Sequence, residues 1–224
     1  MARRKPTSSG KCSLCGRIFA KAAMTAHLKS CARKAQADEG AKKNVAKRPV
    51  FHLVVEGYYL PEYWIHLEVP MAARLELLDQ FLRNVWLECC GHMSAFQIEG
   101  TVYSVAPGDI GEKPMTARLG EAVGPGVTFH HEYDFGDTTY LKLKVLSEYE
   151  SALGAKEIRL LARNEPPVIP CSYCGKPAIR VCVECLYSDE GWLCKACASK
   201  HECDEEMFLP VVNSPRVGVC GYTG

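Results

Sequence analysis

The sequence predicts an α+β fold, an antiparallel sheet with one main packed helix, with a small cysteine-bearing module on either side of it. Three observations predict it. Strand-like and helix-like hydrophobic periods alternate between residues 49 and 165, four Cys and His residues crowd into 12–31, and nine more follow residue 170. Over 224 residues, 47% hydrophobic and 24% charged residues are ordinary values for a globular protein.

The central segment begins with two predicted strands. Residues 50–55 form a continuous apolar run, and residues 62–69 alternate between an apolar side and a second side that carries Trp64, His66 and Glu68. Strict alternation is typical of a strand with one face on the core and one in solvent. We therefore expect the strand at 62–69 to be half-buried.

A helix and further strands follow. Leucines recur at helical spacing over residues 71–88, which predicts an amphipathic helix of about five turns, ended by Gly91. A Pro/Gly-rich loop is expected over 106–126. The remaining predicted strands are 95–99, 101–105, 127–133, 138–146 and 157–162.

The box DFGD at 134–137 connects the predicted strands 127–133 and 138–146 as a hairpin turn, with Gly136 supplying the special backbone angles and an Asp capping backbone amides. An alternative is that Asp134 and Asp137 converge on a divalent cation such as Mg²⁺ in an enzyme. A kinase is excluded, because the chain has neither a Gly-rich phosphate loop nor an HRD-type loop.

The predicted organisation has five parts. A basic disordered tail covers 1–11, a small finger 12–31, a flexible basic linker 32–48, the α+β domain 49–165, and a Cys-rich module 166–224. The linker predicts that the finger moves independently of the domain.

Thirteen cysteines fit metal binding better than disulfides here. The start MARRKP has no apolar run behind its charges, and no stretch reaches the ~20 apolar residues that span a bilayer. We therefore expect a cytoplasmic location without membrane contact, where thiols stay reduced. The cysteines also fall in pairs two residues apart, a spacing typical of zinc sites.

The N-terminal motif has the spacing of a C2HC finger. Two thiolates on a tight turn, followed by a His and a Cys four positions apart on one helical face, can close a tetrahedral zinc site in a ββα-type fold. All four positions come from protein, so the zinc is structural. The predicted ligands are Cys12, Cys15, His27 and Cys31.

The C-terminal module offers nine candidate ligands, enough for two further zinc ions and three in all. They are Cys171, Cys174, Cys182, Cys185, Cys194, Cys197, His201, Cys203 and Cys220. A sequential pairing of the first two Cys pairs in one ribbon is one option. The pattern also resembles cross-brace modules of the B-box or MYND kind, in which alternate pairs share a metal. That resemblance implies one site of Cys171, Cys174, Cys194 and Cys197, and a second of Cys182, Cys185, Cys220 and either His201 or Cys203.

Charge is distributed unevenly. Residues 1–48 hold 13 Lys or Arg against 2 Asp or Glu, a net +11, whereas residues 49–224 hold 14 against 24, a net −10. A basic arm on an acidic body usually contacts a polyanion, DNA or RNA. The candidate nucleic-acid-binding residues are Arg3, Arg4, Lys5, Lys11, Arg17, Lys21, Lys29, Arg33 and Lys34.

Residues 50–147 resemble the plasmid Ri Orf-three-like family, the TnpR-like passenger proteins of insertion elements. The segments that carry the resemblance are FHLVVEGYYLPEYWIHLEVP, LELLDQFL, AFQIEG and HEYDFGDTTYLKLKVL. The resemblance implies an α+β fold with an antiparallel sheet and a packed helix, and a transposon-associated, prokaryotic context. It implies no catalytic mechanism.

Three functions remain open. The first is a non-enzymatic, zinc-dependent nucleic-acid-binding protein. A link to mobile elements would make it a DNA-binding protein. Its C-terminal module would then contact a protein partner. The second is a protein-interaction adaptor, with the ribosome among its targets. The third is a divalent-metal enzyme that uses Asp134 and Asp137.

Cys89, Cys90 and His92 are interpreted as a buried thiol pair beside a histidine, or as a Cys/His nucleophile pair.

Overall fold

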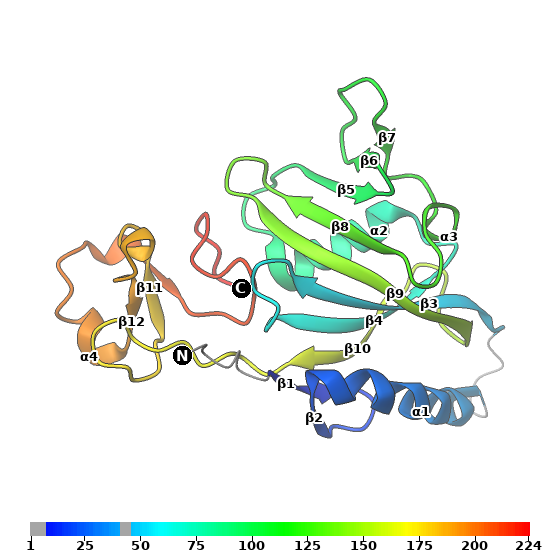
Figure 1. The fold of residues 1–224 in the computed structure, drawn as a ribbon, viewed down its shortest axis with the longest axis horizontal. Coiled ribbons are helices and arrows are strands. Elements are labelled where there is room, and N and C mark those ends of the chain that lie inside the picture. The colour runs from blue at the N-terminus through cyan, green and yellow to red at the C-terminus, as the bar shows by residue number, and fades with distance from the viewer. Residues whose placement is uncertain (1–7, 41–45) are drawn as a thin grey trace, which may run out of the picture.

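The computed structural model describes residues 8–40 and 46–224, and of residues 32–40 the backbone only. Within these residues the protein is mostly sheet with few helices (Figure 1). The strands of the large sheet are β1 (Ser9–Cys12), β2 (Ile18–Ala20), β3 (Arg48–Gly57), β4 (Trp64–Pro70), β5 (Ser94–Ile98), β6 (Thr101–Ser104), β7 (Lys113–Pro114), β8 (Thr128–Tyr133), β9 (Thr139–Ser151) and β10 (Arg159–Asn164). A small sheet holds β11 (Arg180–Cys182), β12 (Trp192–Leu193) and β13 (Phe208–Pro210).

The helices are short apart from the first. They are α1 (Lys21–Gly40), α2 (Leu75–Leu82) with its π-helical continuation (Arg83–Leu87), α3 (Leu119–Ala122), α4 (Lys195–Ala198), and 3₁₀ turns at Leu186–Ser188 and Glu205–Met207. No helix in the described residues combines the length and the apolar character that crossing a membrane requires.

The large sheet has the order β2-β1-β10-β4-β3-β9-β8-β5-β6-β7, and neighbouring strands are antiparallel except for β6 and β7. The predicted antiparallel sheet is therefore confirmed. The small sheet, ordered β12-β11-β13, lies at the other end of the molecule (Figure 1).

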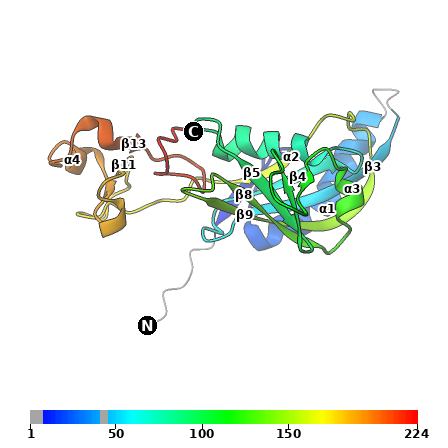
Figure 2. The ribbon, with the colours of Figure 1, turned by 90° about the horizontal axis from the view of Figure 1, so that it is seen from above.

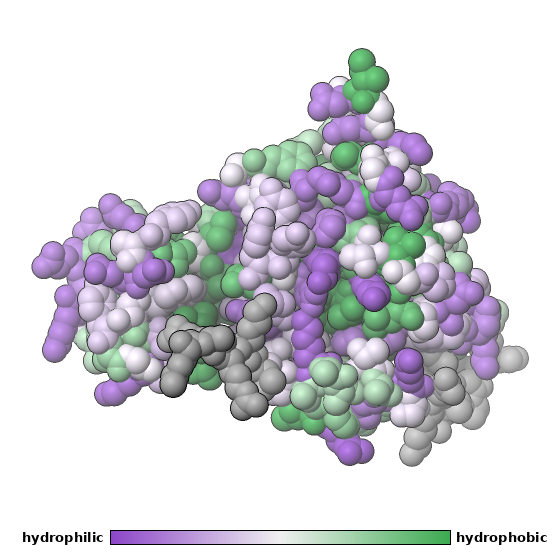
Figure 3. Space-filling model, viewed as in Figure 1, coloured by the Kyte–Doolittle hydropathy of each residue, from purple (hydrophilic) through white to green (hydrophobic). Residues whose placement is uncertain are grey.

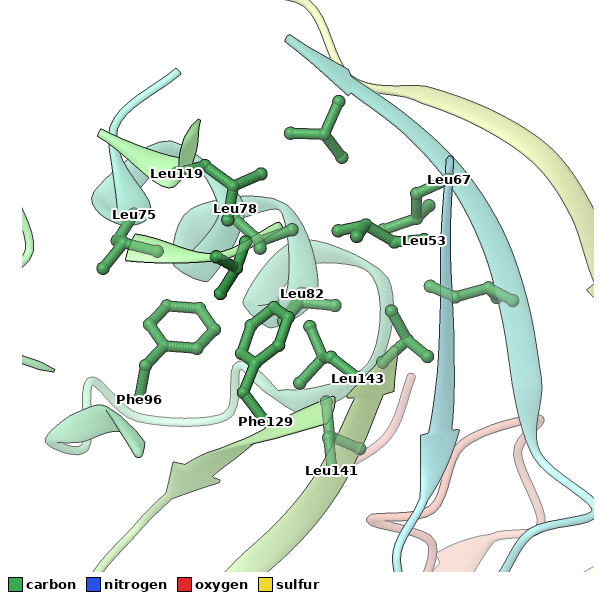
Figure 4. Close-up of a cluster of buried hydrophobic side chains, with 14 of the residues drawn as sticks. Leu53, Leu67, Leu75, Leu78, Leu82, Phe96, Leu119, Phe129, Leu141 and Leu143 are labelled. Atoms are coloured by element: carbon green, nitrogen blue, oxygen red, sulfur yellow. The ribbon is translucent and has the colours of Figure 1, made fainter. Parts of the chain in front are cut away.

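The main core lies between the sheet and α2. The helix contributes the buried leucines at positions 75, 78 and 82, which pack against side chains of β3, β4, β8 and β9 (Figure 4). Fully burying such a side chain contributes about 1.5–3 kcal/mol. The helix begins at Leu75 rather than at the predicted residue 71, because the preceding backbone bonds elsewhere: the Ala73 carbonyl accepts from the Leu119 amide, and Arg74 forms a bridge with Arg118.

Strand β4 is buried on both faces, which corrects the half-buried prediction. Its Ile65 and Leu67 belong to the core under α2, whereas Trp64 points the other way and packs with Met24 and Leu28 of α1. The two helices thus cover opposite faces of the sheet (Figure 2). The prediction was wrong because the alternation of residues within one strand does not show that a helix from a distant segment covers its second face.

The N-terminal finger is packed against the body, whereas the sequence predicted a finger that moves independently. Residues 9–11, expected in the disordered tail, lie in β1, which pairs with β10 along Gly10–Asn164 and neighbouring positions. Residues 32–40 of the predicted linker belong to α1, and this last part of the helix contains Ala, Lys, Gln and Glu, all good helix formers. The Trp64 side chain is fully buried where finger and body meet.

Two loops also differ from prediction. The long loop over 106–126 contains β7 and the single-turn α3. In the hairpin between β8 and β9, Asp134 adopts the left-handed backbone conformation, with φ of 68°, and Gly136 does not. Asp tolerates this region because its short side chain bonds nearby amides, and here Asp134 Oδ1 accepts from the amides of Gly136 and Asp137.

Candidate metal centres

All thirteen cysteines of the chain are described as free thiols, and they gather with three histidines into four clusters of four ligand atoms. Within each cluster the ligand atoms lie within 4.8 Å of one another. We name them the N-terminal cluster (Cys12, Cys15, His27, Cys31), the first module cluster (Cys171, Cys174, Cys194, Cys197), the second module cluster (Cys182, Cys185, His201, Cys203) and the tail cluster (Cys89, Cys90, His92, Cys220).

The N-terminal cluster is assembled by β1, the following turn and α1. Gly16, with φ of 72°, closes the turn after Cys15, and two ligands one helical turn apart come from α1. Cys12 Sγ lies 3.9 Å from Cys31 Sγ, and Cys15 Sγ lies 3.4 Å from His27 Nε2. A tetrahedral zinc site with Zn–S of about 2.3 Å separates its ligand atoms by about 3.5–3.8 Å, so the spacing fits such an ion.

The first module cluster joins the first and third Cys pairs. Cys174 Sγ lies 3.6 Å from Cys194 Sγ and 3.8 Å from Cys197 Sγ. Burial alone would raise the pKa of the Cys171 thiol, but backbone amides, led by that of Cys194, donate to its sulfur and hold the pKa at about 6. This sulfur is therefore favoured as the thiolate that metals require.

The second module cluster uses both residues that the sequence left as alternatives, His201 and Cys203. Cys185 Sγ lies 3.6 Å from Cys203 Sγ. Since the first and third Cys pairs share one cluster and the second pair belongs to the other, the arrangement alternates, and the sequential ribbon pairing is not formed.

Cys220 is not part of the second module cluster, which corrects that assignment. The tail that carries it, residues 213–224, packs against the body: Val217 joins the main core, and Ser214 Oγ donates to the Trp86 carbonyl at 2.6 Å. This path brings Cys220 Sγ to 3.2 Å from His92 Nε2. The signal in the sequence was the ninth module ligand, one more than two sites need.

The candidate nucleic-acid-binding residues separate into three groups. Lys11, Arg17 and Lys29 are exposed around the N-terminal cluster. Lys21 is half-buried, forms an ion pair with Glu56 and donates to the Pro61 carbonyl, so it serves the contact between finger and body. Outside the described residues lie Arg3, Arg4 and Lys5, and likewise the side chains of Arg33 and Lys34.

The carboxylate of Asp134 is fully engaged by protein groups. Its Oδ1 accepts two backbone amides, and its Oδ2 lies 2.6 Å from the Arg216 guanidinium. Asp137 is exposed, and its carbonyl accepts from Arg216. With both oxygens of one carboxylate occupied, the pair Asp134 and Asp137 does not present a divalent-cation site, which counts against the enzyme alternative.

Comparisons with known proteins add little to this geometry. No model of a known protein family matches the chain, and no curated protein sequence matches it significantly. The fold is similar to the crystal structure of a protein of unknown function from Methanosarcina mazei Go1, with a TM-score of 0.46 and 18% identity over 53% of this chain and 70% of that one. A likeness of this size supports no conclusion about function. The resemblance of residues 50–147 to the plasmid Ri Orf-three-like family stays a prediction.

Proposed function

We propose that the protein is a non-enzymatic, zinc-dependent nucleic-acid-binding protein that contacts its polyanion through the N-terminal finger. The observation that carries the proposal is the placement of Lys11, Arg17 and Lys29. All three are exposed around the N-terminal cluster, within the segment whose net charge is +11. Such a concentration of cationic side chains favours binding to phosphates.

Zinc is the metal that the donor sets favour. Thiolates and imidazoles in groups of four suit zinc, whereas magnesium and calcium prefer oxygen ligands. Because protein atoms fill all four positions of each cluster, no position remains for a reacting water. Metal of this kind stabilises a binding surface and supplies no catalysis.

The finger is held on the edge of the large sheet, which supports a role as a rigid contact. The pairing of β1 with β10 and the packing of Trp64 against Met24 and Leu28 fix its orientation. A single finger reads only about 3 bp. We therefore expect binding dominated by phosphate contacts, with little sequence preference.

The test is a salt titration of binding to labelled duplex DNA and to labelled single-stranded RNA, followed by fluorescence anisotropy. Each phosphate contact with duplex DNA contributes about 0.9 to the slope of log affinity against log salt, so the triple variant Lys11→Ala, Arg17→Ala, Lys29→Ala should flatten it by about 2.7. Substitution is preferable to deletion of residues 1–48, because deletion would uncover Trp64.

The matched control replaces three exposed lysines elsewhere, Lys113, Lys156 and Lys176, by alanine. It changes the net charge by the same amount and should leave most of the slope in place. If the two triple variants lose affinity equally, the effect is one of net charge and the finger is not the contact. If neither nucleic acid binds the wild-type protein, the proposal fails.

A protein-interaction adaptor is the second candidate, favoured by the surface of the C-terminal module. Several large hydrophobic side chains are exposed there, among them Val168 at 77% and Tyr187 at 88%. Hydrophobic and hydrophilic residues mix over this end of the molecule (Figure 3). A pull-down before and after nuclease treatment separates the two candidates. A partner that survives nuclease and is lost in Tyr187→Ser, but not in Tyr59→Ser on the body, supports the adaptor.

A further inference from the structure

We propose that the tail cluster, formed by Cys89, Cys90, His92 and Cys220, is a fourth zinc site that fastens the C-terminal tail to the body. The sequence assigned no metal to Cys89, Cys90 or His92. The inference does not depend on what the finger binds, since it concerns only how the chain closes on itself.

The spacing of the ligand atoms is the first support. Cys90 Sγ lies 2.9 Å from His92 Nε2 and 3.9 Å from Cys220 Sγ, and Cys89 Sγ lies 3.7 Å from Cys90 Sγ. The sulfur–sulfur separations match those of the other three clusters, which range from 3.6 to 3.9 Å. They also match the edge of a tetrahedron with Zn–S of about 2.3 Å.

The second support is that the four clusters together contain every cysteine of the chain. The other three clusters use ten cysteines, and the tail cluster uses the three that remain. Each cluster has four ligands, and no cysteine of the chain is left over. An even division into four-ligand sets is what four tetrahedral ions require.

The backbone at the site is the third support. Gly91, with φ of 83°, turns the chain between Cys90 and His92, as glycines turn it after the Cys pairs of the N-terminal and first module clusters. Cys220 itself has φ of 49°, a left-handed conformation that a non-glycine residue adopts at a cost. The preceding helix widens to a π-helix over Arg83–Leu87, a distortion frequent at functional sites.

The surroundings are those of a metal site, because groups that bond the ligands are already in place. The Arg216 guanidinium lies 3.5 Å from Cys89 Sγ, where it donates to the sulfur. Asp134 Oδ2 lies 2.6 Å from this guanidinium and holds it in place, and the Tyr133 ring contacts His92 edge-on. Partners of this kind orient ligands and tune their charge. Residues 133–137, the box DFGD with the preceding Tyr133, thus support the cluster.

Two other states of the same residues are distinguishable. A disulfide between Cys90 and Cys220 requires a separation of about 2.05 Å, against the 3.9 Å observed. With three free thiols beside a histidine, only the weak hydrogen bonds of the Cys220 thiol to His92 and Cys90 would hold Cys220 in its left-handed conformation. Three thiolates and one imidazole form a soft donor set that favours zinc.

The experiment measures zinc per chain by elemental analysis and by native mass spectrometry of the full chain, purified with zinc and then desalted. We expect four zinc ions in the wild-type protein and three in Cys220→Ser, whose substituted side chain is exposed. The matched control is Val219→Ser, the neighbouring tail position, which should retain four. The charge-state distribution in the same spectra reports whether each variant is folded.

The results separate the outcomes cleanly. Three ions in both wild type and Cys220→Ser would overturn the proposal, as would four in both. A metal-free wild-type mass lower by two hydrogen atoms, a deficit that is absent from Cys220→Ser and so places a disulfide at Cys220, would also overturn it. If Cys220→Ser proves unfolded, Cys90→Ser takes its place, with the same expected loss of one ion and the same control.

Discussion

The Arg216 guanidinium lies 2.6 Å from the Asp134 carboxylate, and the arginine side chain is completely buried. It also donates to Thr139 Oγ1 and stacks over the Tyr133 ring, with 4.8 Å between the guanidinium carbon and the ring centroid. The two charged residues are 82 positions apart in the chain. Asp134 in the box DFGD therefore has a structural role, because its ion pair with Arg216 binds the C-terminal tail to the body.

Replacing Arg216 by alanine should lower the free energy of unfolding by about 3–5 kcal/mol, because Asp134 would keep a buried charge without its partner. Urea denaturation of the zinc-loaded protein measures the change. The matched control is Arg74→Ala, since the ion pair of Arg74 with Glu76 is exposed and should contribute no more than about 1 kcal/mol. Equal losses in the two variants would contradict the buried-pair interpretation.

The sequence predicts the local parts of this arrangement well. The N-terminal cluster follows from Cys and His spacing, because its ligands lie close together in the chain, whereas the set of the first module cluster was implied by the resemblance to cross-brace modules. The tail cluster joins positions 92 and 220, and no local pattern specifies such a contact. For the same reason the sequence predicted β4 as half-buried, although α1 from a distant segment covers Trp64.

Gly10 should be intolerant of any side chain, because β1 passes close to the body there. A Cβ atom at this position would lie 2.4 Å from Trp64 and 2.5 Å from the Arg163 carbonyl. We expect Gly10→Ala to lower the free energy of unfolding by about 1–3 kcal/mol, as overpacking does. Gly108→Ala is the control, since a Cβ there meets nothing within 4 Å. Hydrogen exchange of β10 amides would show whether the loss lies at this contact.

The buried pair His52 and His66 should make the protein less stable below neutral pH. The two rings share a hydrogen bond of 2.9 Å, and burial lowers the pKa of His52 to about 4 and that of His66 to about 3 from the ordinary 6.5. Between pH 6.5 and these values the unfolded state binds more protons than the folded state, so the free energy of unfolding falls as the pH decreases.

At pH 5 each buried histidine should cost about 2 kcal/mol relative to pH 7, which urea denaturation at the two pH values can measure. The double variant His52→Gln, His66→Gln should lose less stability over this interval than the wild type. The control is His130→Gln, because His130 is partly exposed on β8. Zinc content measured at both pH values separates this effect from metal loss. An unchanged pH dependence in the double variant would refute the assignment.

The tail cluster should release its metal before the other three. Each of the others contains at least one buried cysteine, namely Cys12, Cys171 with Cys194, or Cys182, whereas Cys90 and Cys220 of the tail cluster are exposed and Cys89 is only half-buried. A chelator or a thiol reagent reaches exposed sulfur first. We therefore expect one equivalent of zinc to be released in a fast phase and three in slower phases. A colorimetric zinc indicator measures the release. The fast phase should be absent in Cys220→Ser and present in Val219→Ser. A fast phase that persists in Cys220→Ser would assign the labile ion to another cluster.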